Sequence, residues 1–254
     1  MAMVVAAFAV GAVVGSFLNV CIYRIPRGIS VAWPPSFCPL CQHRIGPWEN
    51  VPIVAYLYLR GRCRYCGQAI SPRYPLVELM TAILAVAVYL RFGLSLVALR
   101  YAFLGCALLA AVFIDLDHQI IPDVVTLPAL GFGVATAFLL GWCSGVESVL
   151  GAITGAASAL GIAHLGSALF GQDSLGGGDL KLLAAIGAYL GWASLLGALF
   201  LSFLLALPVA IIGLCARKFS LGSKIPFGPF LAVATLVVLF WGRSLWRLYL
   251  ASLR

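Results

Sequence analysis

Long apolar runs are the feature that most constrains how this chain of 254 residues folds. A helix that crosses a membrane needs about 17–25 mostly apolar residues. Runs of this kind lie, with loose ends, at 2–22, 75–91, 95–114, 123–141, 146–170, 196–215 and 226–250, and a shorter apolar segment lies at 180–192. Counting the shorter segment as a short span predicts an all-α polytopic membrane protein with about eight transmembrane helices.

The composition excludes a soluble globular enzyme, because 63% of the residues are apolar and only 9% are charged. An average soluble domain has about a quarter of its residues charged. A disordered or collagen-like chain is excluded on the same ground. The first apolar run has no basic segment before it and no small-x-small cleavage site, so we expect a retained transmembrane helix rather than a signal peptide.

Positive charge is concentrated between Arg24 and Arg73, where seven arginines accompany one acid, Glu49. Beside membrane helices such a segment indicates the cytoplasmic side, so we expect no nucleic-acid partner. The orientation that places 24–73 in the cytoplasm has eleven basic residues inside and five outside. It also turns the loops 115–122 and 171–180 toward the cytoplasm. Three arginines near the C-terminal end oppose this orientation and leave the topology of the last helix open.

The sequence predicts three parts: a first transmembrane helix at 1–23, a cytoplasmic module at 24–73 and a multi-helix membrane domain at 74–254. The module is too small to rely on an apolar core alone. It contains two Cys-x-x-Cys pairs, Cys38 with Cys41 and Cys63 with Cys66. This pattern is typical of a structural zinc site with four thiolate ligands and no position for water. Unligated or redox-active thiols and an iron–sulfur cluster are the alternatives, while a reducing cytoplasm argues against disulfides.

Two acids stand out because carboxylates at membrane helices are costly and are candidates for function. Asp115 directly follows the apolar run 95–114, and Asp179 follows three glycines. If the two carboxylates meet, one keeps a proton while the other activates water. Helix dipoles favour the proton on Asp115, at a helix C-terminus, and the charge on Asp179, at a helix N-terminus. A structural pair or an ion-pathway pair is the alternative.

Other polar positions near these acids are candidates for supporting roles. Asp123 starts the next span, and Lys181 either pairs with substrate or anchors at the interface. The three glycines permit close approach of another chain segment. The supporting residues are therefore Gly176, Gly177, Gly178, Lys181 and Asp123, whereas Asn19, Glu49 and Glu78 are interpreted as packing or hydrogen-bonding residues.

Taken together, these motifs resemble the type IV prepilin leader peptidase family, which consists of bifunctional Gly-x-Gly-Asp membrane aspartic peptidases that are also N-methyltransferases. The resemblance is carried by residues 15–24, both cysteine pairs, and residues 49–52, 73–78, 115–123 and 176–181. It implies that Asp115 and Asp179 are the catalytic pair. It also implies a prepilin or pseudopilin substrate of a type IV pilus or type II secretion system, and a place in the bacterial inner membrane with the active site facing the cytoplasm. Cleavage after a Gly would expose an N-terminal residue, commonly Phe, for methylation by S-adenosylmethionine.

The methyltransferase activity is implied by the resemblance alone. No Gly-x-Gly-x-x-Gly motif follows a strand, and fifty residues cannot hold a nucleotide-binding α/β domain. A donor site would therefore be built from the cytoplasmic module and its adjoining helices, with ligands that the sequence does not assign. The competing interpretations are a proton-relay transporter, a zinc-stapled assembly scaffold and a peptidase without methyl transfer. The transporter predicts internal pseudo-symmetry, and none is visible in the sequence.

Overall fold

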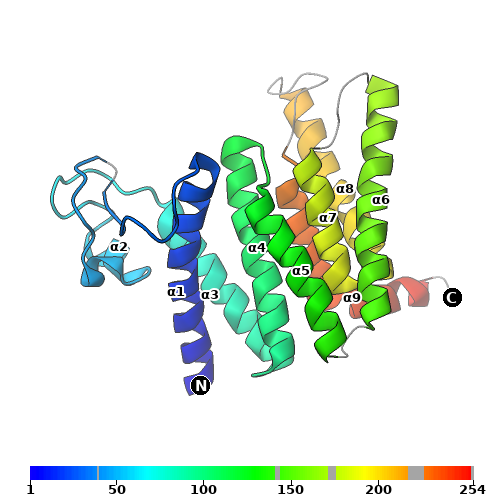
Figure 1. The fold of residues 1–254 in the computed structure, drawn as a ribbon, viewed down its shortest axis with the longest axis horizontal. Helices are drawn as coiled ribbons and strands as arrows, with labels where there is room; N and C mark the ends of the chain where they lie inside the picture. The colour runs from blue at the N-terminus through cyan, green and yellow to red at the C-terminus, as the bar shows by residue number, and fades with distance from the viewer. Residues whose placement is uncertain (39, 141–143, 171–175, 217–225, 253–254) are drawn as a thin grey trace. The chain divides into compact units, whose positions relative to one another are not determined.

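The computed structural model describes all residues except 39, 141–143, 171–175, 217–225 and 253–254 (Figure 1). The described part of the chain is helical, with two isolated β-bridges and no strand, which confirms the all-α class. The long helices are α1 (Ala2–Arg24), α3 (Arg73–Phe92), α4 (Leu96–His118), α5 (Asp123–Leu140), α6 (Gly145–Phe170), α7 (Gly177–Leu190), α8 (Trp192–Cys215) and α9 (Gly228–Ser252). Short turns of helix, η1 (Ile25–Arg27), η2 (Pro47–Asn50) and α2 (Val54–Tyr58), lie between α1 and α3.

Six of the long helices are long and apolar enough to cross a membrane, namely α1, α3, α4, α5, α6 and α8. The described apolar part of α9, Gly228–Gly242, is shorter, and α7 has only 14 residues. The boundaries differ from the apolar runs at two functional places. Helix α4 continues past residue 114 to His118, so Asp115 lies in its last turn. Helix α8 begins at Trp192 rather than 196, because Gly191 alone separates it from α7.

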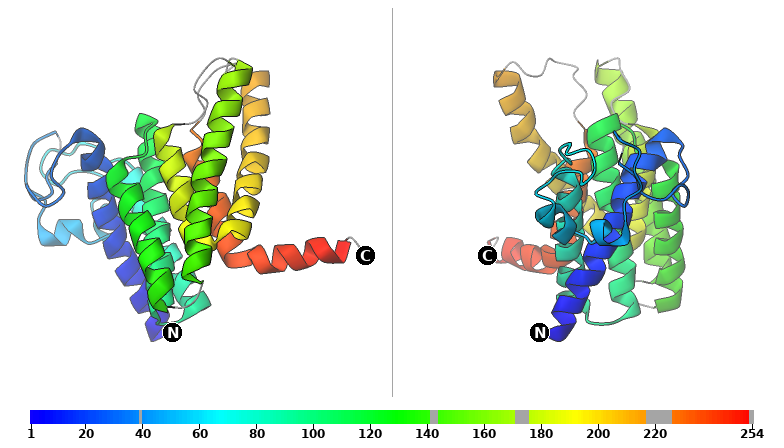
Figure 2. Two further views of the ribbon diagram at one scale, coloured as in Figure 1. Left: turned by 45° about the vertical axis from the view of Figure 1, so that its right-hand side comes forward. Right: turned by 90° about the vertical axis from the view of Figure 1, so that its left-hand side faces the viewer.

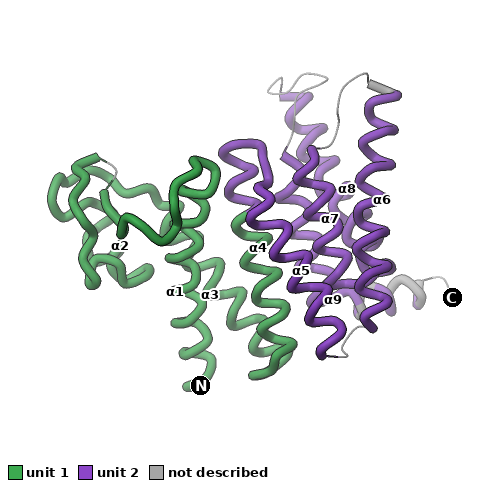
Figure 3. Tube along the Cα trace, viewed as in Figure 1, with its two compact units in different colours: residues 1–110 green, residues 111–254 purple. Residues whose placement is uncertain are grey.

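The chain forms two compact units, Met1–Ala110 (unit 1) and Ala111–Arg254 (unit 2) (Figure 3). The boundary falls inside α4. The division into 1–23, 24–73 and 74–254 follows the expected membrane boundaries instead of packing, and it stays a prediction.

In unit 1, α1 packs against α3 through two glycines one helical turn apart. A Cβ atom on Gly15 would lie 2.6 Å from Cα of Glu78, and one on Gly11 would lie 2.7 Å from Cα of Ala82. Small residues four positions apart allow such close approach of membrane helices. The packing places the end of α1 beside the start of α3, where the Asn19 amide nitrogen donates a 3.0 Å hydrogen bond to the Tyr74 carbonyl oxygen.

In unit 2, α7 is the central helix, and its residues from Leu182 to Tyr189 are all buried. With 14 residues it is about 21 Å long, shorter than a bilayer core. It contacts α5, α6, α8 and α9 (Figures 1 and 2). A Cβ on Gly187 would lie only 2.0 Å from the Gly151 carbonyl oxygen of α6, and Ser148 of α6 donates a 2.7 Å hydrogen bond to the Ala188 carbonyl. Because its neighbours hold α7 so closely, the first turn of α7 has a defined position.

Candidate active site and metal centre

Asp115 is buried in the last turn of α4, with 6% of its surface exposed. Its Oδ2 accepts a 3.1 Å hydrogen bond from the backbone N–H of Gly228, the first residue of α9. The first N–H groups of a helix have no partner within the helix, so they suit an anionic oxygen. The start of α9 therefore stabilises the charged form of this carboxyl group.

Asp179 lies in the first turn of α7, ahead of the apolar segment of that helix. Its Oδ2 accepts a 3.3 Å hydrogen bond from the Gly176 N–H. Its Oδ1 is buried and has no hydrogen-bond partner among the described residues. Burial, followed by repulsion from the nearby charge of Asp115, raises the pKa of Asp179 to about 6, while the Gly176 hydrogen bond acts in the opposite direction. The two predicted acids thus lie close enough for the charge of Asp115 to act on Asp179.

The three glycines before Asp179 differ in their surroundings. Gly176 precedes α7 and donates to Asp179, and Gly177 has open space where a side chain would project. Gly178 lies against the segment that follows α4, since a Cβ there would be 2.7 Å from the Ile121 carbonyl oxygen. Only Gly178 is therefore required for close approach of backbones.

Lys181 and Asp123 form an ion pair, with Nζ 2.5 Å from Oδ1. Asp123 is the first residue of α5, as the sequence predicts, and Lys181 lies one turn into α7. The pair joins the first residue of α5 to the second turn of α7, next to Asp179. The sequence left two roles open for Lys181, pairing with substrate or anchoring at the membrane interface. The structure shows a further contact, the ion pair with Asp123.

The sequence reasoning did not identify Gly228. The signal was present, because the last apolar run, 226–250, begins with Pro226, Phe227, Gly228 and Pro229, and Pro is favoured in the first turn of a helix. What the sequence does not show is that this helix start lies against Asp115, which is 113 positions away.

The four predicted metal ligands come together in unit 1, with the sulfur atoms of Cys38, Cys41, Cys63 and Cys66 all within 4.8 Å of one another. Each pair lies in a small hairpin closed by an isolated β-bridge, Phe37 with Arg44 and Arg62 with Ala69. A left-handed residue follows the second cysteine of each pair, Gln42 at φ 59° and Gly67 at φ 69°. The two hairpins therefore have the same local backbone arrangement.

The sulfur geometry fits one metal ion. Four thiolates at about 2.3 Å from zinc lie about 3.8 Å apart in a tetrahedron, and Sγ of Cys38 is 4.0 Å from Sγ of Cys66. Hydrogen bonds from the Cys66 and Tyr65 backbones lower the pKa of the Cys63 thiol to about 7. For Cys41, a backbone hydrogen bond at His43 lowers the pKa, but partial burial and the other three thiols outweigh it and raise the pKa to about 11. A bound cation would stabilise all four thiolates at once, so that one thiol would no longer raise the pKa of another.

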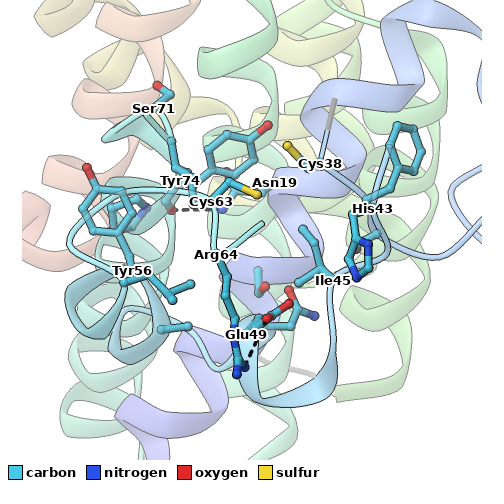
Figure 4. A pocket seen from close by; sticks show the side chains of 18 of the residues that line it. Asn19, Cys38, His43, Ile45, Glu49, Tyr56, Cys63, Arg64, Ser71 and Tyr74 are labelled. Carbon is cyan, nitrogen blue, oxygen red and sulfur yellow. Dashed lines mark hydrogen bonds and ion pairs between the residues drawn. The ribbon is translucent and has the colours of Figure 1, made fainter. Parts of the chain in front are cut away.

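A cavity of about 420 Å³ lies beside these cysteines, within unit 1 (Figure 4). Its walls come from α1, the segment between α1 and α3, and the start of α3, and both Cys38 and Cys63 border it. Asn19, Glu49 and Glu78, which the sequence suggested as packing or hydrogen-bonding residues, all line the cavity and each make a hydrogen bond. Figure 4 shows the Arg64 side chain paired with Glu49, at 3.5 Å.

Comparison with known proteins identifies relatives over nearly the whole chain. The bacterial peptidase A24 N-terminal domain matches residues 9–92, and the type IV leader peptidase family matches residues 102–211. A prepilin leader peptidase/N-methyltransferase of Pseudomonas aeruginosa is 38% identical over 98% of this chain and 94% of its own length. Proteins of the same name from Pseudomonas putida and Aeromonas hydrophila are each 39% identical, over 93% and 94% of this chain and 90% and 91% of their own lengths.

No solved structure matches the chain. The family matches together span both units, and the relatives align along almost their full lengths. The resemblance seen in the motifs is thereby confirmed: the chain belongs to the type IV leader peptidase family, as a multi-pass prepilin peptidase with N-methyltransferase activity.

Proposed function

We propose that this enzyme cleaves prepilin or pseudopilin leaders at the cytoplasmic face of the bacterial inner membrane, with Asp115 and Asp179 as its catalytic pair. We also propose that it methylates the new N-terminus from S-adenosylmethionine. The observation that carries the proposal is that the buried carboxyl group of Asp115 in α4 lies near the half-buried carboxyl group of Asp179 in α7, whose pKa it raises. The names of the relatives supply the substrate class.

The contacts favour the proton on Asp179, opposite to the expectation from helix dipoles. Asp115 accepts a 3.1 Å hydrogen bond from the Gly228 N–H, and Asp179 accepts a longer one, 3.3 Å, from the Gly176 N–H; both suit a charged carboxylate. Asp179 has a buried oxygen without a partner, which a proton makes less costly. The two groups titrate as a pair, so this assignment concerns the dominant singly protonated state.

In that state the two acids divide the hydrolysis. The Asp115 carboxylate takes a proton from a water molecule, and the water oxygen attacks the scissile carbonyl carbon. Asp179 gives its proton to the carbonyl oxygen, so no charged oxygen accumulates. On collapse of the resulting diol, Asp115 gives the proton that it took from water to the amide nitrogen, the C–N bond breaks, and a carboxylic acid remains on the leader. Asp179 regains its proton in the same step.

Charge distribution supports a cytoplasmic site. If the arginine-rich segment 24–73 lies in the cytoplasm, helices that alternate in direction place the end of α4 and the starts of α5, α7 and α9 on that same side. These four ends carry Asp115, Asp123, Asp179 and Gly228. A substrate helix in the lipid would then present its basic leader to the side that holds the acids. Nothing in this arrangement calls for nucleic acid as a partner.

We propose Zn²⁺ as the ion of the four-cysteine cluster, in a structural role. The supporting observation is a set of four cysteines whose sulfur atoms all lie within 4.8 Å of one another. Four thiolate ligands would leave no position for a reacting water. The bound ion would hold the two hairpins together in a module that has few other means of folding.

Mass spectrometry of a prepilin incubated with the purified protein in detergent tests the proposal, with and without S-adenosylmethionine. The wild type should remove the leader and add one methyl group when the donor is present. Asp115→Asn and Asp179→Asn should abolish cleavage. Asp117→Asn, an exposed acid two residues from Asp115, should change the rate by no more than about twofold, as surface substitutions usually do. Equal cleavage by wild type and Asp179→Asn would remove the two-aspartate mechanism.

A further inference from the structure

The cavity of unit 1 has the size and the lining of a small-molecule site. Its volume of about 420 Å³ lies within the range of about 300–1,000 Å³ that is common for ligand and cofactor pockets. Three separate parts of the chain build it, and none of its lining residues belongs to unit 2. The acids of the cleavage site take no part in it, so the cavity needs a role of its own.

Glu78 supplies a buried negative charge to this cavity. Only 9% of its surface is exposed, and its Oε2 accepts a 2.7 Å hydrogen bond from the Ile53 N–H. Among the described residues it has no ion-pair partner, whereas Glu49 in the same cavity is paired with Arg64. A buried carboxylate without a counter-ion is costly, and a bound cation offsets that cost. Three arginines, Arg24, Arg44 and Arg64, also line the cavity, so it suits a ligand that carries both a cationic centre and an anionic group.

Asn19 and two tyrosines complete this lining. Asn19 is 7% exposed, and its amide nitrogen is engaged by the Tyr74 carbonyl, while its Oδ1 accepts no hydrogen bond among the described residues. An acceptor at this depth is available to an N–H group of a ligand. The rings of Tyr56 and Tyr74 stand at the same cavity (Figure 4). Tyrosine rings stack on flat heterocycles and attract cations at their faces.

We propose that this cavity binds S-adenosylmethionine, with the Glu78 carboxylate facing its sulfonium centre, and with Asn19 and the tyrosines receiving its purine and amino groups. The ligand combines a positive centre with a purine ring and N–H donors, which matches the three features of the lining. The inference rests on the proposed methyl transfer. In that transfer the N–C bond forms as the C–S bond breaks, the bonding pair stays on sulfur in a neutral thioether, and the amine gives up one proton to solvent.

Direct binding of tritiated S-adenosylmethionine to the full-length protein in detergent tests the assignment without any turnover. Glu78→Gln keeps an oxygen for the Ile53 N–H but removes the charge. We expect its Kd for the donor to rise about tenfold or more, the scale of losing a buried charge partner. Glu147→Gln is the matched control, because Glu147 lies in the first turn of α6, outside the cavity. Its Kd should equal that of wild type, and this control variant should still remove the leader.

The outcomes separate this inference from the proposed function. If wild type binds the donor and Glu78→Gln binds it equally well, the cavity assignment is overturned while methyl transfer stands. If wild type neither binds the donor nor methylates a synthetic, already cleaved pilin peptide, both proposals fail. If Glu78→Gln also loses cleavage, the substitution has damaged the whole enzyme, and its Kd does not test the cavity. Photo-crosslinking of the donor to wild type then tests where the donor binds. Attachment within residues 16–78 supports the inference, and attachment confined to 111–254 overturns it.

Discussion

The backbone N–H of Gly228 donates a 3.1 Å hydrogen bond to the Asp115 carboxylate, so the start of α9 meets the end of α4. A Cβ atom on Gly228 would lie 2.7 Å from Oδ2 of Asp115. Gly228→Ala must therefore displace the carboxyl group or the helix. We expect kcat for leader cleavage to fall by about tenfold to a hundredfold, the cost of a misplacement of about 1 Å at a reacting group. Steady-state cleavage of a purified prepilin measures this.

Gly131→Ala is the control for that substitution, because Gly131 of α5 has open space at the same position. It should leave kcat unchanged. A Gly228→Ala enzyme that cleaves at the wild-type rate would show that the contact with Asp115 has no part in catalysis.

Two neighbouring glycines before Asp179 should respond differently to the same change. Gly178→Ala brings a methyl group to 2.7 Å from the Ile121 carbonyl oxygen, whereas Gly177→Ala meets nothing within 4 Å. We expect Gly178→Ala to lower kcat at least about tenfold, since α7 must shift with its aspartate. Gly177→Ala should retain most of the activity. Equal loss in both variants would mean that backbone freedom, not close approach, is what the glycines provide.

The sequence predicted the helical class, the cysteine cluster and both candidate acids, because each depends on local pattern. Apolar runs predict membrane helices, and two Cys-x-x-Cys pairs predict four ligands of one metal ion. Asp115 and Asp179 stand out since acids are rare in such a chain. The structure places these residues where the patterns suggest, although their chemical roles remain proposals.

Contacts between distant segments lay beyond the sequence. The pairing of Gly228 with Asp115 and of Lys181 with Asp123 depends on how helices pack, and helix packing is set by the shapes of many side chains together. The proton assignment illustrates the difference. Helix dipoles alone favour the proton on Asp115, whereas we propose it on Asp179, because one oxygen of Asp179 is buried without a hydrogen-bond partner among the described residues. The cavity of unit 1 is likewise built from three segments with no shared motif.

The Lys181–Asp123 pair should act on catalysis more than on stability. Both side chains are partly exposed, at 36% and 55%, and such pairs contribute only about 0–1 kcal/mol to folding. The pair nevertheless fixes the turn that carries Asp179. We expect Asp123→Asn and Lys181→Met each to lower kcat about threefold to tenfold, with little change in Tm, on the scale of the coupling between residues in contact.

Exchange of the two charges tests the same pair. The double variant Asp123→Lys with Lys181→Asp should recover part of the lost kcat, and the double-mutant cycle measures the coupling. A double variant that is worse than the product of the two single changes would argue that the charges act separately.

Removal of the metal should impair the functions of unit 1 more than the leader cleavage that we assign to unit 2. Cys38→Ser leaves three thiolates, so we expect the bound metal to fall from one ion per chain toward none by elemental analysis. Because Cys38 and Cys63 border the cavity, donor binding should weaken together with metal content. Leader cleavage should fall less, since its two acids lie in unit 2.

The control variant is Cys215→Ser, which changes an exposed cysteine of α8 and should keep the metal. Full metal content in Cys38→Ser would exclude this cysteine as a ligand.

Leader cleavage should lose rate as the pH rises through the pKa of Asp179, which burial and then the Asp115 charge raise to about 6. The required proton is bound below that pH and lost above it, so kcat/KM should fall about tenfold per pH unit on the alkaline side.

The hydrogen bond from the Gly176 N–H opposes the rise in the pKa of Asp179. Gly176 has φ −75°, which proline adopts, so Gly176→Pro removes the N–H without demanding a new backbone angle. We expect Gly176→Pro to move the alkaline limb to higher pH. Gly176→Ala keeps the N–H, and its Cβ would lie 3.4 Å from Oδ2 of Asp179, an ordinary contact, so its limb should stay in place. A limb that moves equally in both variants would trace the shift to the added side chain rather than to the lost hydrogen bond.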